Sequence, residues 1–343
     1  MTQKYFPDIV GNEALKERFS KDIEGNFLAH AYILEGPQGT GKHTFAREVA
    51  AAIECEERGH GSLVPCGRCK CCEKILGDKS PDVITMGLED DKVTIGVEAI
   101  RNLKNDMYTA PNDLSVKVYI IEDADRMTMQ AQNAFLLSLE EPPAYVLFFL
   151  LCENSASLLE TVRSRAPTLR TRRIGQSQLE EYLLTKEKRA AALKEEAPRE
   201  FRELLCVSDG SIGYATELLD SKRRKQVFDC RVFAKATVSL LSGSNKARVL
   251  EAVVAFGSKR QEVSTRLGYV QYALRDLILL KKDEHAPLCF FEERDYAAEL
   301  ATHYTLDALF LLYDAIGKAL DDLERNANVR LTLTCMMQNA GLI

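Results

Sequence analysis

A glycine-rich stretch that follows a short apolar segment has the residue types and spacing of a phosphate-binding loop. Its residues are Gly36, Pro37, Gln38, Gly39, Thr40, Gly41, Lys42, His43 and Thr44. Glycines let the backbone curl so that successive N–H groups converge on an anion at a helix N-terminus. Lys42 would reach the terminal phosphates of a nucleoside triphosphate. The stretch therefore predicts an ATP/Mg²⁺ site, but His43 stands where a Mg²⁺-binding hydroxyl normally follows the lysine.

Four cysteines shortly after this loop have the number and spacing of a metal site. They are Cys55, Cys66, Cys69 and Cys72, in the pattern C-x₁₀-C-x₂-C-x₂-C. Four thiolates close the tetrahedral shell of a structural zinc ion. A disulfide or a redox C-x-x-C pair is the alternative, but a cytosolic compartment and the knuckle spacing favour zinc. Cys71 is a fifth thiol that could replace Cys72.

Two acidic residues, Glu122 and Asp123, follow the most apolar segment of the chain, 116–121. A near-continuous apolar run is typical of a parallel strand buried on both faces. Acids at the carboxyl end of such a strand, beside a phosphate loop, are placed to hold a metal–nucleotide. The alternative is that both are solvated strand-end acids that bind no metal.

The elements that must position these residues alternate between strands and helices. Strands are predicted near 32–34, 80–86, 116–121 and 146–151, with helical patterns between them, and this order predicts an α/β nucleotide-binding fold. Beyond about residue 175 only helical patterns remain. The basic run at 221–225 interrupts the helical patterns and is predicted to be a linker.

Composition sets limits on the function. The chain has 343 residues and a formal net charge of −6, which argues against coating nucleic acid with the whole surface. No apolar run is long enough to span a membrane, and the N-terminus lacks the apolar core of a secretory signal. We therefore expect a cytoplasmic protein with no membrane partner.

Several motifs occur together in one order. They are Ile9–Gly11, His30–Tyr32, Gly36–Lys42, the four-cysteine insertion, Lys117–Ile121, Asn133–Pro143 and Val162–Arg165, with looser matches at Asp209–Gly213 and Asn326–Leu331. In these segments the chain resembles the bacterial clamp-loader subunits of the AAA+ class, and most closely the delta-prime type of DNA polymerase III.

The resemblance implies three domains and a place in an assembly. We expect a RecA-like AAA+ domain over 1–175 with a zinc module at about 55–72, a helical lid over 176–222, and a helical collar for oligomerisation over 223–343. The partners implied are gamma/tau and delta-type subunits in a hetero-oligomeric ring. Through that ring the chain would act on a sliding clamp and primer-template DNA.

The resemblance also assigns roles to single residues. Val10 and Gly11 would belong to the nucleotide site, and Asn154, or the adjacent Glu153, would sense the γ-phosphate. Arg165, in the motif Ser164-Arg165, would be an arginine finger that reaches a neighbouring subunit's nucleotide and is worth about 10³–10⁵ in rate there. A surface ion pair is the alternative role for Arg165.

Three departures from the family pattern concern hydrolysis by the chain itself. His43 replaces the metal-binding hydroxyl, and Thr44 is rotated roughly 100° around the helix from that position. The acids run Glu122-Asp123 where the family has Asp then Glu, and Gly213 stands where an active subunit has Arg. We therefore expect bound ATP/Mg²⁺ to be weakened and hydrolysis weak or absent.

The function predicted from these residues is a mostly non-hydrolysing, delta-prime-like subunit of the DNA polymerase III assembly that supplies Arg165 to a neighbour. An active, gamma-like ATPase motor is the alternative, favoured by Lys42 and the acidic pair. A zinc-containing DNA-binding module is a third possibility, which the acidic net charge disfavours.

Overall fold

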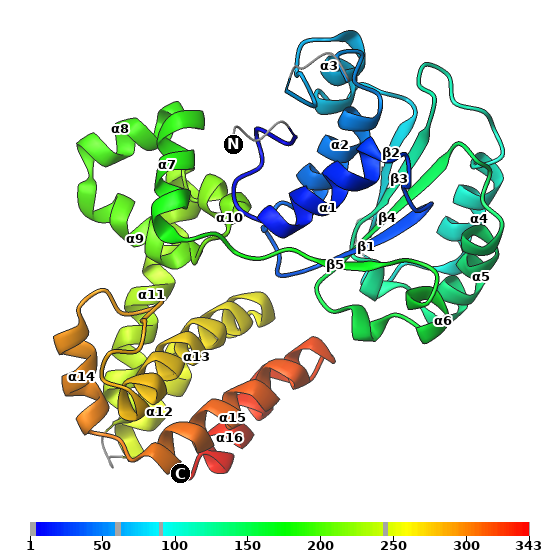
Figure 1. The fold of residues 1–343 in the computed structure, drawn as a ribbon. Helices are drawn as coiled ribbons and strands as arrows, with labels where there is room; N and C mark the ends of the chain where they lie inside the picture. The colour runs from blue at the N-terminus through cyan, green and yellow to red at the C-terminus, as the bar shows by residue number, and fades with distance from the viewer. Residues whose placement is uncertain (1–4, 59–62, 89–91, 243–245, 343) are drawn as a thin grey trace. The chain divides into compact units, whose positions relative to one another are not determined.

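The computed structural model describes residues 5–58, 63–88, 92–242 and 246–342 (Figure 1). Two compact units make up the chain. Unit 1 comprises Met1–Lys186 together with Gly210–Tyr214, and unit 2 comprises Glu187–Asp209 and Ala215–Ile343. Among the described residues, no helix combines the length and the apolar character needed to cross a membrane.

Unit 1 is built on a five-stranded sheet whose order is β2-β3-β4-β1-β5. Every neighbouring pair is parallel. The strands are β1 (Ala31–Glu35), β2 (Val83–Met86), β3 (Lys117–Ile121), β4 (Val146–Cys152) and β5 (Thr168–Arg170). The predicted parallel α/β fold is confirmed. β3 and β4 are buried along their whole lengths, as their continuous apolar runs require.

Helices cover both faces of this sheet because alternate strand residues point to opposite sides (Figure 1). Tyr32 and Leu34 belong to one core with α1 (Glu13–Glu24), α2 (Lys42–Ile53) and α3 (Lys70–Leu76). Ala31 and Ile33 belong to the other core. That core includes residues of α4 (Val97–Asp106), α5 (Met129–Glu140) and α6 (Glu160–Arg163).

Two 3₁₀ turns and one more helix complete the larger segment of unit 1. The turns are η1 (Ala124–Arg126) after β3 and η2 (Ser155–Ser157) after β4, and α7 (Gln176–Lys186) follows β5. α5 begins at a Thr128 cap, whose side chain accepts from the Ala131 N–H, and ends just before Pro142 and Pro143. The ends of α5 therefore follow from its flanking residues.

Unit 2 is helical throughout its regular structure. Its helices are α8 (Lys188–Glu196), α9 (Pro198–Ser208), α11 (Ser221–Leu241), α12 (Lys246–Ala255), α13 (Arg260–Lys282), α14 (Arg294–Thr302), α15 (Leu306–Glu324) and α16 (Val329–Asn339). α10 (Ile212–Glu217) begins in unit 1 and ends in unit 2. α13 and α15 contribute most of their apolar stripes to one core.

The predicted linker at 221–225 is wrong. These basic residues form the first turn of α11, whose N-cap is Asp220; its side chain accepts from the Arg223 N–H at 2.9 Å. An aspartate before a polar run is a helix-start signal, and the charged composition masked it. Arg224 is also anchored, because its guanidinium donates to Glu200 at 2.9 Å.

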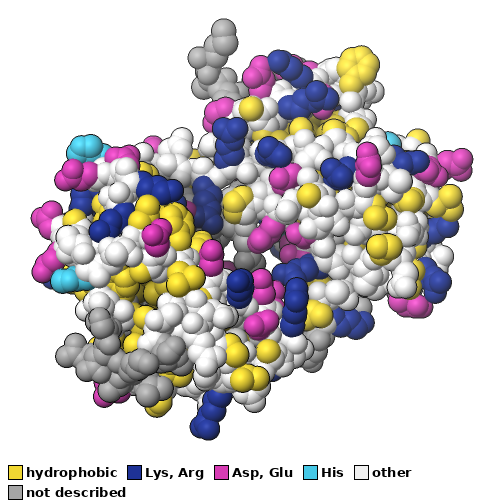
Figure 2. Space-filling model, turned by 90° about the horizontal axis from the view of Figure 1, so that it is seen from below, with side chains coloured by type: hydrophobic (Ala, Val, Ile, Leu, Met, Phe, Trp, Pro, Cys, Tyr) yellow, Lys and Arg dark blue, Asp and Glu magenta, His cyan; other side chains and the backbone are white. Residues whose placement is uncertain are grey.

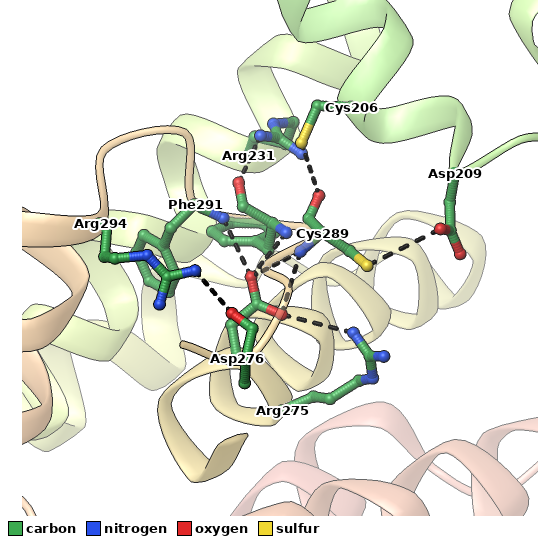
Figure 3. Close-up of polar contacts among 10 residues, drawn as sticks. Cys206, Asp209, Arg231, Arg275, Asp276, Cys289, Phe291 and Arg294 are labelled. Carbon is green, nitrogen blue, oxygen red and sulfur yellow. Dashed lines mark hydrogen bonds and ion pairs between the residues drawn. The ribbon is translucent and has the colours of Figure 1, made fainter. Parts of the chain in front are cut away.

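The non-helical segment between α13 and α14 is held by two buried charged side chains (Figure 3). Asp276 is fully buried and accepts from the N–H groups of Cys289, Phe290 and Phe291 at 3.0, 2.7 and 3.1 Å. Arg231 is 2% exposed, donates to the Phe290 carbonyl and pairs with Glu203. A buried charge is tolerated only with such partners, so these contacts fix the segment onto its helices.

Candidate functional site

Three strand ends place the predicted site residues at one edge of the sheet. β1, β4 and β3 are neighbours in the sheet, and their carboxyl ends lead into the phosphate loop, Asn154 and Glu122 respectively. Ligands of open parallel sheets bind beyond this edge. The topology therefore brings the predicted nucleotide residues to one side of unit 1, as their order in the sequence requires.

The phosphate loop has the backbone that its glycines predict. Gly39 and Gly41 have φ values of 74° and 82°, a region that favours glycine. A Cβ at Gly41, the N-cap of α2, would meet nothing within 4 Å, so the space there is open. The curl and the helix N-terminus together form an anion cradle.

The other glycines of the loop are covered by the protein's own residues. A Cβ at Gly36 would lie 2.2 Å from Thr171 Oγ1, and one at Gly39 would lie 2.0 Å from Ser211 Oγ. The Gly213 N–H donates to the Gly39 carbonyl at 3.2 Å. Gly213, where the resemblance predicts an arginine in an active subunit, thus contacts the loop through its backbone alone.

Side chains of the loop are engaged within the loop. Lys42 Nζ donates to the carbonyls of Gly36 and Pro37 at 2.5 and 3.0 Å, and Thr40 Oγ1 donates to Pro37 at 2.8 Å. Burial lowers the pKa of Lys42, while the nearby Glu153 raises it. A phosphate that enters the cradle would replace the Gly36 and Pro37 carbonyls as the hydrogen-bond acceptor of the Lys42 ammonium. The residues present therefore fit the phosphate groups of a nucleotide.

His43 lies between the ends of β2 and β3. Its Nε2 is 3.2 Å from Thr85 Oγ1 and 4.0 Å from Glu122 Oε1. Burial lowers the pKa of His43, partly offset by the charge of Glu122, so the neutral imidazole is favoured at pH 7. The His43 imidazole stands where the resemblance predicts a Mg²⁺-binding hydroxyl, and it lies beside the carboxylate of Glu122. Mg²⁺ prefers an octahedral shell of oxygen ligands, so these residues fit Mg²⁺ poorly, and Thr44 is exposed on α2.

The remaining predicted nucleotide residues have local partners. Asp123 is exposed and adopts φ 48° at the start of η1. The Asn154 amide oxygen accepts from the Ala156 N–H at 3.0 Å and so caps η2. A Cβ at Gly11 would lie 2.7 Å from Ile174 Cγ2. Val10 is partly buried beside it in the sequence.

Arg165 follows α6 and lies at the surface of unit 1. Its Nη1 donates to the Thr161 carbonyl at 2.8 Å, and its Nη2 contacts Glu140 Oε1 at the end of α5. The Arg165 side chain is 34% exposed. The Arg165 guanidinium therefore forms an ion pair within the chain and is also accessible to a ligand from solvent.

The four predicted cysteines converge in a separate cluster after α2. All four sulfur atoms of Cys55, Cys66, Cys69 and Cys72 lie within 4.8 Å of one another, and the Cys66 and Cys72 sulfurs are 4.0 Å apart. Tetrahedral Zn–S bonds of about 2.3 Å imply sulfur separations of about 3.8 Å. The arrangement can hold a metal ion, and the donor set fits zinc.

Backbone N–H groups support these sulfurs. The N–H groups of Cys69 and Cys72 donate to the sulfurs of Cys66 and Cys69, each at 3.4 Å. Burial alone would raise the pKa of Cys66, but N–H groups, those of Arg68 and Cys69, lower it to about 7. Cys71 lies apart from the four and contacts Glu56 at 3.7 Å, so the structure places Cys72 in the cluster, as predicted, and not Cys71.

Comparisons with known proteins find subunits of DNA polymerase III. A family model described as DNA polymerase III, delta subunit, matches residues 11–174. The Bacillus subtilis DNA polymerase III subunit tau is 24% identical over 95% of this chain and 59% of that protein. The Pseudomonas aeruginosa subunit delta' is 32% identical over 53% of each chain. Over its N-terminal half the chain is similar to subunits of DNA polymerase III, which supports a clamp-loader subunit of the AAA+ class. The match spans less than two thirds of each of these clamp-loader relatives.

The names of the clamp-loader relatives do not separate the subunit types. Tau and delta' both occur among them, and a Mycoplasma pneumoniae gamma/tau subunit is 34% identical over 48% of this chain and 24% of that protein. Among solved structures, a gamma subunit-related protein of Thermotoga maritima has 19% identity and a TM-score of 0.43, over 96% of this chain and 98% of that one.

Some contacts of this chain are not predictable from the sequence. Thr171 and Ser211 cover the phosphate loop from 131 or more positions away, Thr171 through a 2.9 Å contact between hydroxyls with Thr40. Ser211 stood inside a motif matched to the family, but nothing in that motif identified its contact. Glu140 likewise stood inside the segment Asn133–Pro143, and its pairing with Arg165 is a tertiary contact.

Proposed function

We propose that this clamp-loader chain is a delta-prime-like subunit of the DNA polymerase III assembly that hydrolyses ATP weakly or not at all. It supplies Arg165 as an arginine finger to an adjacent gamma/tau-type ATPase in a ring that opens a sliding clamp at primer-template DNA. The observation that carries the proposal is the contrast between two positions: a neutral histidine at the metal position of its own site, and an accessible arginine at the family's finger position.

The chemistry assigned to each site follows from its residues. ATP, when bound, would supply the phosphates that the loop and Lys42 hold. His43 beside Glu122 would weaken any bound Mg²⁺ and the charge stabilisation it provides. Arg165 would stabilise the charge that develops on the transferring phosphate of the neighbouring site. The domain plan proposed is an AAA+ domain with a structural zinc module, a lid and an oligomerising collar.

The test compares hydrolysis by the chain with hydrolysis that it promotes. Reconstituted with a gamma/tau-type subunit of the same organism, the wild-type chain should raise the ATPase rate of the assembly, and Arg165→Ala should lower it by about 10³-fold or more at the completed site. Arg163→Ala, the exposed neighbour on α6, is the matched control and should leave the rate unchanged. An unchanged rate with Arg165→Ala would refute the finger.

The gamma-like motor remains the second candidate because the phosphate loop keeps its lysine and its open N-terminal cradle. Robust steady-state ATP hydrolysis by the isolated chain, abolished by Lys42→Ala, would favour it over the delta-prime-like role. A DNA-binding module has less support, since Lys and Arg are interspersed with Asp and Glu on the face shown in Figure 2.

A further inference from the structure

The contacts of Arg165 define how its guanidinium is held. Nη1 donates to the Thr161 carbonyl at 2.8 Å and lies 3.4 Å from Ser164 Oγ, both within the turn of α6 that precedes the arginine. Nη2 is held by the Glu140 carboxylate, which belongs to a different helix, α5. Local contacts therefore fix one nitrogen, and Glu140 fixes the rotation of the guanidinium plane about it.

The position of Glu140 suits this role. It is the last residue of α5, a helix whose buried face packs in the sheet core and whose end is set by the following prolines. A carboxylate at the end of such a rigid element holds its partner more accurately than one on a loop. Glu141, the next residue, is exposed and lies outside the helix.

The exposure of the Arg165–Glu140 ion pair indicates that it contributes little to the stability of the fold. The side chains of Arg165 and Glu140 are 34% and 42% exposed. Ion pairs this accessible contribute little to folding stability. Arginine, however, has a planar fork with five N–H donors, and its contacts with Thr161 and Glu140 engage only the two terminal nitrogens. Donors remain for an anion arriving from outside.

We propose that Glu140 is a positioning residue for the arginine finger: its carboxylate orients the Arg165 guanidinium so that the remaining N–H groups meet the nucleotide phosphate of a neighbouring subunit. This inference rests on the proposed function of Arg165. Glu140 touches neither nucleotide nor metal and acts only through the arginine. Because the guanidinium is held before assembly, less side-chain freedom is lost when it contacts phosphate.

The experiment measures kcat and KM for ATP in the reconstituted assembly with a gamma/tau-type subunit. Glu140→Gln keeps the shape of the side chain and removes its charge. It should lower kcat about 3- to 10-fold with KM unchanged, less than the roughly 100-fold that a displacement of about 1 Å can cost. Glu141→Gln is the matched control and should change neither. Glu140→Asp keeps the charge and should recover part of the rate.

A double-mutant comparison makes the role specific. In the Arg165→Ala background, Glu140→Gln should cause no further loss, because its effect passes through the arginine. Thermal unfolding of Glu140→Gln should match that of Glu141→Gln, which excludes a general loss of structure.

The outcomes distinguish the inference from the function it rests on. If Arg165→Ala lowers kcat while Glu140→Gln does not, the finger stands and the positioning role is wrong. A rise in kcat with Glu140→Gln also overturns it, since the carboxylate would then restrain the finger. If Arg165→Ala has no effect, both proposals fail together. If the losses in kcat of Glu140→Gln and Arg165→Ala were additive in the double mutant, Glu140 would act independently of Arg165 and the positioning role would be wrong.

Discussion

The phosphate loop and the four-cysteine cluster lie at opposite ends of one helix, α2, and differ in how completely their residues are brought together. After the helix, the four cysteine sulfurs converge within 4.8 Å, with backbone N–H groups donating to them. At the N-terminal end of the helix, the loop keeps its curl, but His43 stands where the resemblance predicts a Mg²⁺-binding hydroxyl, and Thr171 and Ser211 cover two of the loop's glycines. The difference shows that a sequence motif can identify a candidate site, whereas the residues around the motif determine which ligand the site can bind.

The largest effect is expected at the complete site. Purified protein should contain about one zinc per chain, because four thiolates close a single shell. Cys69→Ser should remove the metal and expose the segment around α3 to proteolysis, since binding of the metal supplies folding energy to such modules. Cys71→Ser is the control and should retain the metal. Metal analysis with limited proteolysis checks this, and metal retained in Cys69→Ser but lost in Cys71→Ser would reverse the assignment.

A smaller effect is expected from repairing the incomplete site. His43→Thr would return a hydroxyl to the metal position and release Glu122 from the imidazole. A hydrogen bond or contact to a charged group is worth about 1.5–3 kcal/mol, so Mg²⁺ should increase nucleotide affinity roughly 10-fold or more in the variant. Calorimetric titration with and without Mg²⁺ measures it.

The wild-type chain should show little Mg²⁺ dependence in the same titration. Thr44→Ala, on the exposed side of α2, should behave as wild type. If Mg²⁺ raised the nucleotide affinity of the wild-type chain as strongly as that of His43→Thr, then His43 would not impair the metal site, and the contrast with the cysteine cluster would be wrong.

The sequence predicted those features that depend on local pattern. Continuous apolar runs predicted the buried strands, and cysteine spacing predicted a cluster that forms as expected. Residues whose roles depend on distant partners were not predictable, because nothing near Thr171 or Glu140 in the sequence marks their contacts with Thr40 and Arg165. The prediction of a linker for the basic run in α11 is wrong because a cluster of charges is typical of a linker, whereas Asp220 caps a helix there.

α2 itself carries a group without a hydrogen-bond partner between its two ends. Glu48 is 4% exposed, and its Oε2 has no partner among the described residues. Burial, together with the charge of Asp8, raises the pKa of Glu48 to about 7, although the charge of Lys186 opposes both effects. The native state therefore holds a proton that the unfolded state releases at lower pH.

The free energy of unfolding should accordingly fall as pH rises from about 4.5 to about 7 and level off above that range. Glu48→Gln mimics the protonated form, so it should stabilise the protein by about 1–2 kcal/mol at pH 8 and have little effect near pH 5. Denaturant unfolding at both pH values measures the difference. Glu98→Gln, exposed on α4, changes the net charge equally and should leave the pH dependence unaltered. If Glu48→Gln destabilised the protein at pH 8, the ionised Glu48 carboxylate would have a stabilising partner in the folded protein, and this prediction would be wrong.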